Sequence, residues 1–190
     1  MDNSSDKRSK GKKRSGSAVN VRWILTICTV SFLLSVMMSY VSERALNSVG
    51  NAVAFLILLL FILIGILFDI IGVAATAATE KRFHSMAARK VPGAKQSIWI
   101  VRNAEKVGSF CNDVVGDISG IISGATSAII IARLIHGTDV VSVLLSLAIT
   151  GGVAALTIGG KALGKTVGIS HSEDIVAVVG RILAFLPWKK

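Results

Sequence analysis

The sequence is poor in the residues that build disulfide frameworks, histidine-rich metal sites and catalytic centres. Its 190 residues include two cysteines, two prolines and three histidines, and only 6% are aromatic. Cys28 and Cys111 stand far apart, which argues against a disulfide framework or a zinc site. The histidines (His84, His136 and His171) are scattered, and we find no phosphate-binding loop and no nucleophile beside recognisable partners. An enzyme is therefore the least favoured class of protein.

What the sequence has instead is four long apolar runs. The chain is 52% hydrophobic, with a mean hydropathy of +0.68. Each run approaches the roughly 20 residues that cross a bilayer, and a backbone in lipid must be helical because it has no water to bond with. We therefore predict an all-α integral membrane protein with about four transmembrane helices, at 21–43, 48–79, 110–134 and 139–160.

The positive charges lie between these runs rather than among them. Lys and Arg number 21 against 11 Asp and Glu, and they concentrate before the first run, between the second and third, and after the fourth. This distribution argues against nucleic acid and follows the positive-inside rule. We predict a multi-pass protein of the plasma membrane with both termini cytoplasmic. Residues 1–20 are predicted to be a disordered basic tail; contact of this tail with anionic lipid is the alternative.

Two segments outside the spans have helical spacing. Pro92-Gly93 divides the segment 80–108 into two pieces, which predicts a helical hairpin at the cytoplasmic interface or a docked hairpin without function. Ser170 and Glu173 fit a capping box that opens a short helix at 172–187. This helix is too short to span, so we expect it to be interfacial.

The third run carries its polar residues on one side. At about 100° per residue, Asp113, Asp117 and the glycines Gly116, Gly120 and Gly124 share one face. We expect this face to point inward and the opposite apolar face, which includes Val114, Ile118 and Ile122, to point to lipid. Glycines four residues apart permit close helix packing, which is their ordinary role and favours a homodimer.

Carboxylates inside a membrane usually face a cavity or a partner. Asp69 in the second run and Asp117 in the third are expected at similar depths, with Asn112, Asp113 and Lys161 nearer the cytoplasmic side. Such an oxygen-rich cluster suits a hard divalent cation such as Mg²⁺. The alternative is an internal ion pair between Lys161 and one or two aspartates, with no ion bound. In the fourth run, Gly151-Gly152 and Gly159-Gly160 favour either a kinked or unwound helix or close packing against the glycine-rich third run.

Residues 52–186 resemble the transmembrane domain of the cyclin M / CorB–CorC group of magnesium and cobalt transporters. The family's Ser-Gly-x-Glu-Thr-Ala motif resembles residues 72–77, its basic hairpin resembles 81–93, its Asn-Asn pair resembles Asn112-Asp113, and its Phe-Gly-Glu-x-x-Pro-Lys motif resembles 159–165. The resemblance implies a dimeric helical unit at 48–187, without the family's C-terminal regulatory domains, to which the helix at 21–43 is an added anchor. It also implies a magnesium site at Asn112, Asp113 and Gly160.

The chain departs from the family at the acids of these motifs. Ala75 replaces the glutamate of the first motif, and Lys161 and Gly164 replace the glutamate and the proline of the last. Two functions follow as expectations. The first is a membrane transporter-like protein for divalent cations, with a site built from Asp69, Asn112, Asp113, Asp117 and Gly160. The second is a non-transporting structural or interaction protein in which Lys161 neutralises that site.

Overall fold

The computed structural model describes residues 21–47, 49–135 and 139–185, and within these ranges every regular element is helical. The predicted tail 1–20 and the last residues of the predicted interfacial helix lie outside the described part. In chain order the elements are α1 (Val21–Asn47), α2 (Asn51–Ala77), α3 (Glu80–Ala88), α4 (Ala94–Arg102), α5 (Ala104–Ser109), the π-helix η1 (Phe110–Gly116), α6 (Asp117–Leu134), α7 (Val140–Ser170) and α8 (Ser172–Phe185).

Within the described residues, four helical stretches are long and apolar enough to cross a membrane. They are Ile24–Arg44, Asn51–Ala77, Ala104–Leu134 and Val140–Ser170, of 21, 27, 31 and 31 residues. The third combines α5, η1 and α6 into one continuous rod. The sequence prediction of an all-helical membrane protein with four spanning helices is confirmed at this level.

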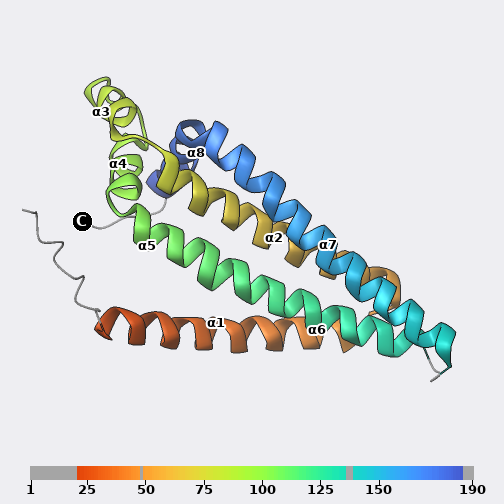
Figure 1. The fold of residues 1–190 in the computed structure, drawn as a ribbon. Helices are drawn as coiled ribbons and strands as arrows, with labels where there is room; N and C mark the ends of the chain where they lie inside the picture. The colour runs from red at the N-terminus through yellow and green to blue at the C-terminus, as the bar shows by residue number, and fades with distance from the viewer. Residues whose placement is uncertain (1–20, 48, 136–138, 186–190) are drawn as a thin grey trace, which may run out of the picture.

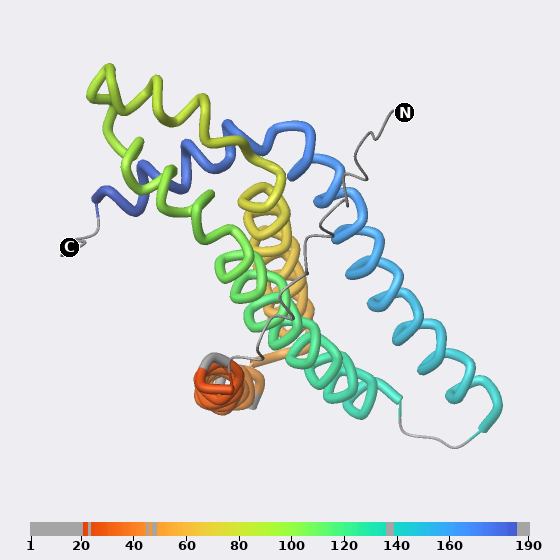
Figure 2. The backbone as a smooth tube through the Cα atoms, turned by 60° about the vertical axis from the view of Figure 1, so that its left-hand side comes forward, coloured from red at the N-terminus to blue at the C-terminus, as the bar shows by residue number. Residues whose placement is uncertain are grey.

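Helix α2 lies at the centre of the bundle. Figures 1 and 2 show it between α7 on one side and the α5–α6 rod on the other, with α1 beside the rod and away from α7. On the rod, Val114, Ile118 and Ile122 are buried with Phe61 of α2, and Ile27, Leu34 and Met38 of α1 pack against them. Val114, Ile118 and Ile122 therefore face protein, not lipid, and the sequence prediction is wrong for them, whereas Ile121 of the same predicted face is 64% exposed. The physical reason is α1, which supplies an apolar partner for that face.

Helix α7 is one continuous helix through all of its glycines. It packs on α2 with Gly160, Gly164 and Gly168, where a Cβ atom would meet side chains of Ile66 and Ile70 or the Ile70 carbonyl oxygen. The helix ends at Ser170, ten residues beyond the predicted end of the span. Close packing on the third span, the alternative expected for these glycines, is wrong: Gly160 packs on Ile66 of α2, and at Gly151, Gly152 and Gly159 a Cβ atom would meet nothing within 4 Å.

At one end of the bundle, α3, α4 and α8 form a separate layer, which we call the end layer (Figures 1 and 2). Its core contains Phe83, Ile100, Val176 and Ala177, which cluster with Ala74 and other small residues at the end of α2. Because these side chains come from segments up to about a hundred residues apart, the end layer ties the chain after α7 to the hairpin after α2. The hairpin of two helices expected around Pro92-Gly93 is present as α3 and α4.

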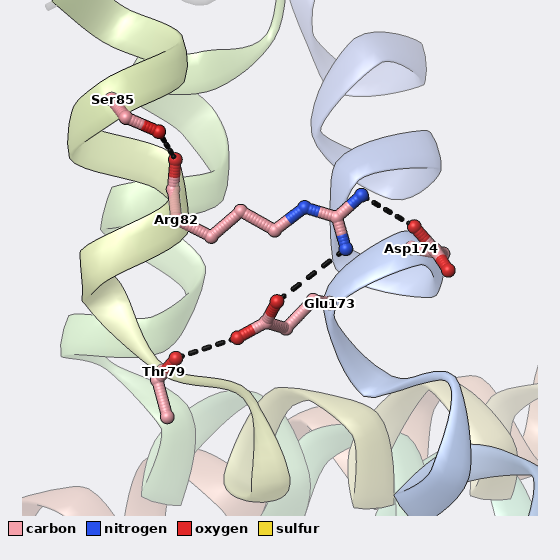
Figure 3. Close-up of polar contacts among 5 residues, drawn as sticks. All are labelled: Thr79, Arg82, Ser85, Glu173 and Asp174. Atoms are coloured by element: carbon pink, nitrogen blue, oxygen red, sulfur yellow. Dashed lines mark hydrogen bonds and ion pairs between the residues drawn. The ribbon is translucent and has the colours of Figure 1, made fainter.

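Polar contacts fix the position of α8 on α3 (Figure 3). Arg82 bonds Glu173 at 3.4 Å and Asp174 at 2.6 Å, and Thr79 Oγ1 donates to Glu173 at 2.6 Å. The capping box predicted from Ser170 and Glu173 is wrong, because Ser170 belongs to α7, where its hydroxyl bonds the Val167 carbonyl oxygen. Glu173 is thus used to hold α3 rather than to cap α8.

Candidate membrane-embedded polar site

Asp69 is the acidic side chain that the bundle buries. It is only 4% exposed, and its Oδ2 atom has no hydrogen-bond partner. It lies on α2 between Gly65, which contacts Ser119 and the Gly116 carbonyl oxygen, and Gly72, which contacts Asn112. Residues three and four apart share a helix face, so Asp69 lies on the face of α2 that packs on η1. A carboxylate in this position is expected to have a partner or a functional role.

Asn112 lies on the facing element. Its side chain packs so closely over Gly72 that a Cβ atom there would overlap the Asn112 amide. The Oδ1 atom of Asn112 is buried and, like Oδ2 of Asp69, has no hydrogen-bond partner. We call Asp69 and Asn112 the orphan pair, because the two unpartnered oxygens lie along one interface about a helical turn apart. Leaving a buried polar group unpaired costs about 1–3 kcal/mol, so two on one interface indicate a place for something to bind.

The backbone at Asn112 is a π-helix, which spans Phe110–Gly116. Such single turns are rare and often mark functional sites. The apolar pattern predicts a regular helix in this region, and no periodicity signal reveals the change. What the sequence does show is the polar run Asn112-Asp113 in the middle of an apolar rod.

Lys161 of α7 reaches the end of this π-helix. Its Nζ atom donates to the Gly116 carbonyl oxygen at 3.3 Å and lies 4.0 Å from Asp117 Oδ1. Asp117 is an outlying partner, with 71% of its side chain exposed against 24% for Lys161. Because solvent reaches Asp117, water screens this ion pair, and it contributes little to stability.

The structure does not gather the predicted acids into one cluster. Asp113 and Asp117 are exposed, whereas Asp69 is buried. Among the described residues no group of three or more His, Cys, Asp or Glu side chains is placed to hold a metal ion. Of the residues predicted for the site, Asp69 and Asn112 lie on elements that face each other, α2 and η1, Lys161 and Asp117 form an ion pair, and Gly160 packs on Ile66 of α2.

Sequence reasoning missed the glycines of α2 that make room for the site. A Cβ atom at Gly65 would be 3.1 Å from Cβ of Ser119, and one at Gly72 would overlap Asn112. Their positions on either side of Asp69, four residues before it and three after it, are a helix-face signal that was present in the sequence. This spacing predicts that the backbone of the facing helix approaches α2 closely at the depth of Asp69.

The fold and the orphan pair together define a membrane protein of several helices with unpaired oxygens inside the bundle. Comparison of the chain with family models, curated proteins and solved structures found no match. The arrangement of its own residues is therefore the basis for assigning a function.

Proposed function

We propose that this chain is a transporter-like membrane protein that binds a divalent cation, with Mg²⁺ as the expected cargo, at the orphan pair. The observation that carries the proposal is the burial of two unpartnered oxygens, Asp69 Oδ2 and Asn112 Oδ1, along one helix interface. Carboxylate and amide oxygens are ligands of hard cations, and Mg²⁺ commonly keeps several of its waters while using one or two carboxylates. The two oxygens of the orphan pair thus match the share of the Mg²⁺ coordination shell that a protein usually supplies.

The resemblance to the cyclin M / CorB–CorC group supports the same proposal. The hairpin of α3 and α4 follows the first of the three resembling spans, as the hairpin of that family does, and Asn112 stands at the position of the family's Asn pair. By the positive-inside rule, we propose that the basic end layer and both termini lie on the cytoplasmic side. We propose the plasma membrane as the location of this multi-pass protein.

We further propose that the functional unit is a homodimer. A Cβ atom added at Gly120 or Gly124 of α6 would meet no atom within 4 Å, and both glycines line an open groove of about 520 Å³ between α6 and α7. Small residues at this spacing permit another helix to pack closely. In the proposed dimer, a second copy of α6 packs along this groove. The protein mass of the purified particle in detergent tests whether the protein is a dimer.

Magnesium flux into liposomes tests the transport proposal. We expect purified protein to admit Mg²⁺ to an internal dye faster than empty liposomes do, and Asp69→Asn to reduce the flux by about 10- to 100-fold, the range seen when groups at a metal site are altered. Glu105→Gln, an exposed acid on α5, serves as the matched control and should leave the flux unchanged. Flux equal to that of empty liposomes, with correctly folded protein, would rule transport out.

The second candidate function is a structural or interaction protein that does not transport. It is favoured by one observation, the hydrogen bond from Lys161 to the Gly116 carbonyl oxygen, which places an ammonium group beside the π-helix. A fixed positive charge there opposes entry of a divalent cation. The liposome assay repeated with Lys161→Glu separates the two functions. Magnesium flux in this variant but not in the wild type would favour the second function, and flux in the wild type favours the first.

A further inference from the structure

Four exposed basic side chains surround the turn between α3 and α4 in the end layer. Arg89, Lys90 and Lys95 come from the turn itself and its flanks, and Arg181 comes from α8. They are placed together because the Gly93 backbone touches that of α8: a Cβ atom at Gly93 would be 2.6 Å from the Arg181 nitrogen. The Ser97 hydroxyl reinforces this contact by donating to the carbonyl oxygens of Gly93 and Val176. We call these four residues the basic turn.

No acidic residue offsets the basic turn. The sequence has no Asp or Glu between Glu80 and Glu105, and none after Asp174. The other acids of the end layer are already paired elsewhere: Glu80 with Arg102 and His84, and Glu173 and Asp174 with Arg82. Hydrogen bonds from His84 and then Arg102 lower the pKa of Glu80, so that carboxylate remains charged and engaged with them. The basic turn therefore presents an unbalanced positive surface.

One of its lysines is held in a costly backbone conformation. The Lys90 and Val91 amides donate to the carbonyl oxygens of Ala87 and Met86, which is the pattern of a Schellman motif. The residue at this position must adopt a left-handed conformation, and Lys90 does so with φ +56°. Glycine is usual there, because a side chain costs about 1–2 kcal/mol in this region. A lysine kept at a glycine position points to a use for its charge.

The exposed face of α8, next to the basic turn, is apolar. Val178, Ile182 and Phe185 lie at i, i+4 and i+7 and are 53%, 57% and 90% exposed, while the opposite face of the helix is buried on the hairpin. Arg181 lies within this apolar stripe, three residues after Val178 and one before Ile182. Apolar side chains with an embedded arginine are typical of a helix that lies in the boundary between lipid headgroups and acyl chains.

We infer that the basic turn binds the phosphate headgroup of an anionic phospholipid in the leaflet that contacts α8. The apolar stripe of α8 enters the acyl boundary and sets Arg181 at headgroup depth. Lys90, Lys95 and Arg89 then add their charges around the same headgroup. This inference rests on the end layer alone and does not depend on a cation site at Asp69.

Retention of lipid by the purified full-length protein tests the inference. We would compare dioleoyl phosphatidylglycerol with dioleoyl phosphatidylcholine by native mass spectrometry from detergent. We expect the wild type to retain phosphatidylglycerol in preference, and Lys90→Gly to weaken that retention by about fivefold, the value of one basic residue near an anionic surface. Lys90→Gly should unfold at the same or a higher temperature, because glycine relieves the left-handed conformation. This variant separates the charge from any structural role of the residue.

Lys81→Ala on α3 is the matched control, since it removes one exposed lysine about a helix length from the turn. Equal retention of both lipids by the wild type would overturn the inference. So would equal loss of phosphatidylglycerol in Lys90→Gly and Lys81→Ala, or no loss in either. Displacement of the lipid by added inorganic phosphate would also overturn it, because it would show a site for soluble anions.

Discussion

At the scale of residues, the function depends on which polar groups the bundle buries. The sequence indicated Asp69, Asn112, Asp113 and Asp117 together, because each is a polar residue in or beside an apolar run. The structure separates the four, since Asp69 and Asn112 alone among them present buried unpaired oxygens. The two other aspartates lie where the rod is exposed, and Lys161 reaches one of them. The sequence could not make this distinction, because the direction of a helix face depends on what packs against it.

Gly72 is the residue that positions Asn112. We predict that Gly72→Ala displaces the Asn112 side chain and destabilises the protein by about 1–3 kcal/mol, the usual effect of overpacking. Thermal unfolding in detergent measures this. Gly151→Ala on α7 is the control, because a Cβ atom there meets nothing within 4 Å and Gly151 does not line the groove proposed for a second copy. Equal effects of the two substitutions would show that Asn112 is not seated on Gly72.

At the scale of elements, the sequence predicted the number and rough position of the helices better than their ends. The fourth span extends to Ser170 because Gly160, Gly164 and Gly168 continue to pack on α2 beyond the apolar run. A hydropathy pattern indicates where the apolar run ends, but a helix continues as far as packing on another helix stabilises it. The π-helix η1 was also beyond prediction, since a one-residue change in winding leaves the apolar composition unaltered.

Helix α7 has glycines that pack on α2 and glycines that face open space, and substitutions at the two kinds should differ in effect. Gly168→Ala should destabilise the protein, since its Cβ atom would lie 3.0 Å from the Ile70 carbonyl oxygen, which belongs to a backbone that cannot move aside. Gly159→Ala should be neutral or stabilising by up to about 1 kcal/mol, because it meets open space and alanine favours a helix. Unfolding curves of the two variants under identical conditions make the comparison. Destabilisation by Gly159→Ala of the same size would contradict the packing described for α7.

At the scale of the whole molecule, four apolar helices and a three-helix end layer divide the chain into a spanning part and a surface part. The sequence predicted both parts from charge and hydropathy. It did not predict that α8 and the hairpin share one core, because their contacts join residues about a hundred positions apart. The joined layer links the end of α7, through α8, to the start of α3, where Arg82 bonds Glu173 and Asp174.

The central claim is that the orphan pair binds a divalent cation, and a titration of the purified full-length protein with Mg²⁺ by isothermal calorimetry tests it most directly. We predict saturable binding to the wild type, with affinity lowered about 10- to 100-fold in both Asp69→Asn and Asn112→Ala and unchanged in Glu105→Gln. Circular dichroism of each variant establishes that it is folded. Absence of binding to folded wild-type protein, or binding that is the same in Asp69→Asn as in the wild type, would contradict the claim.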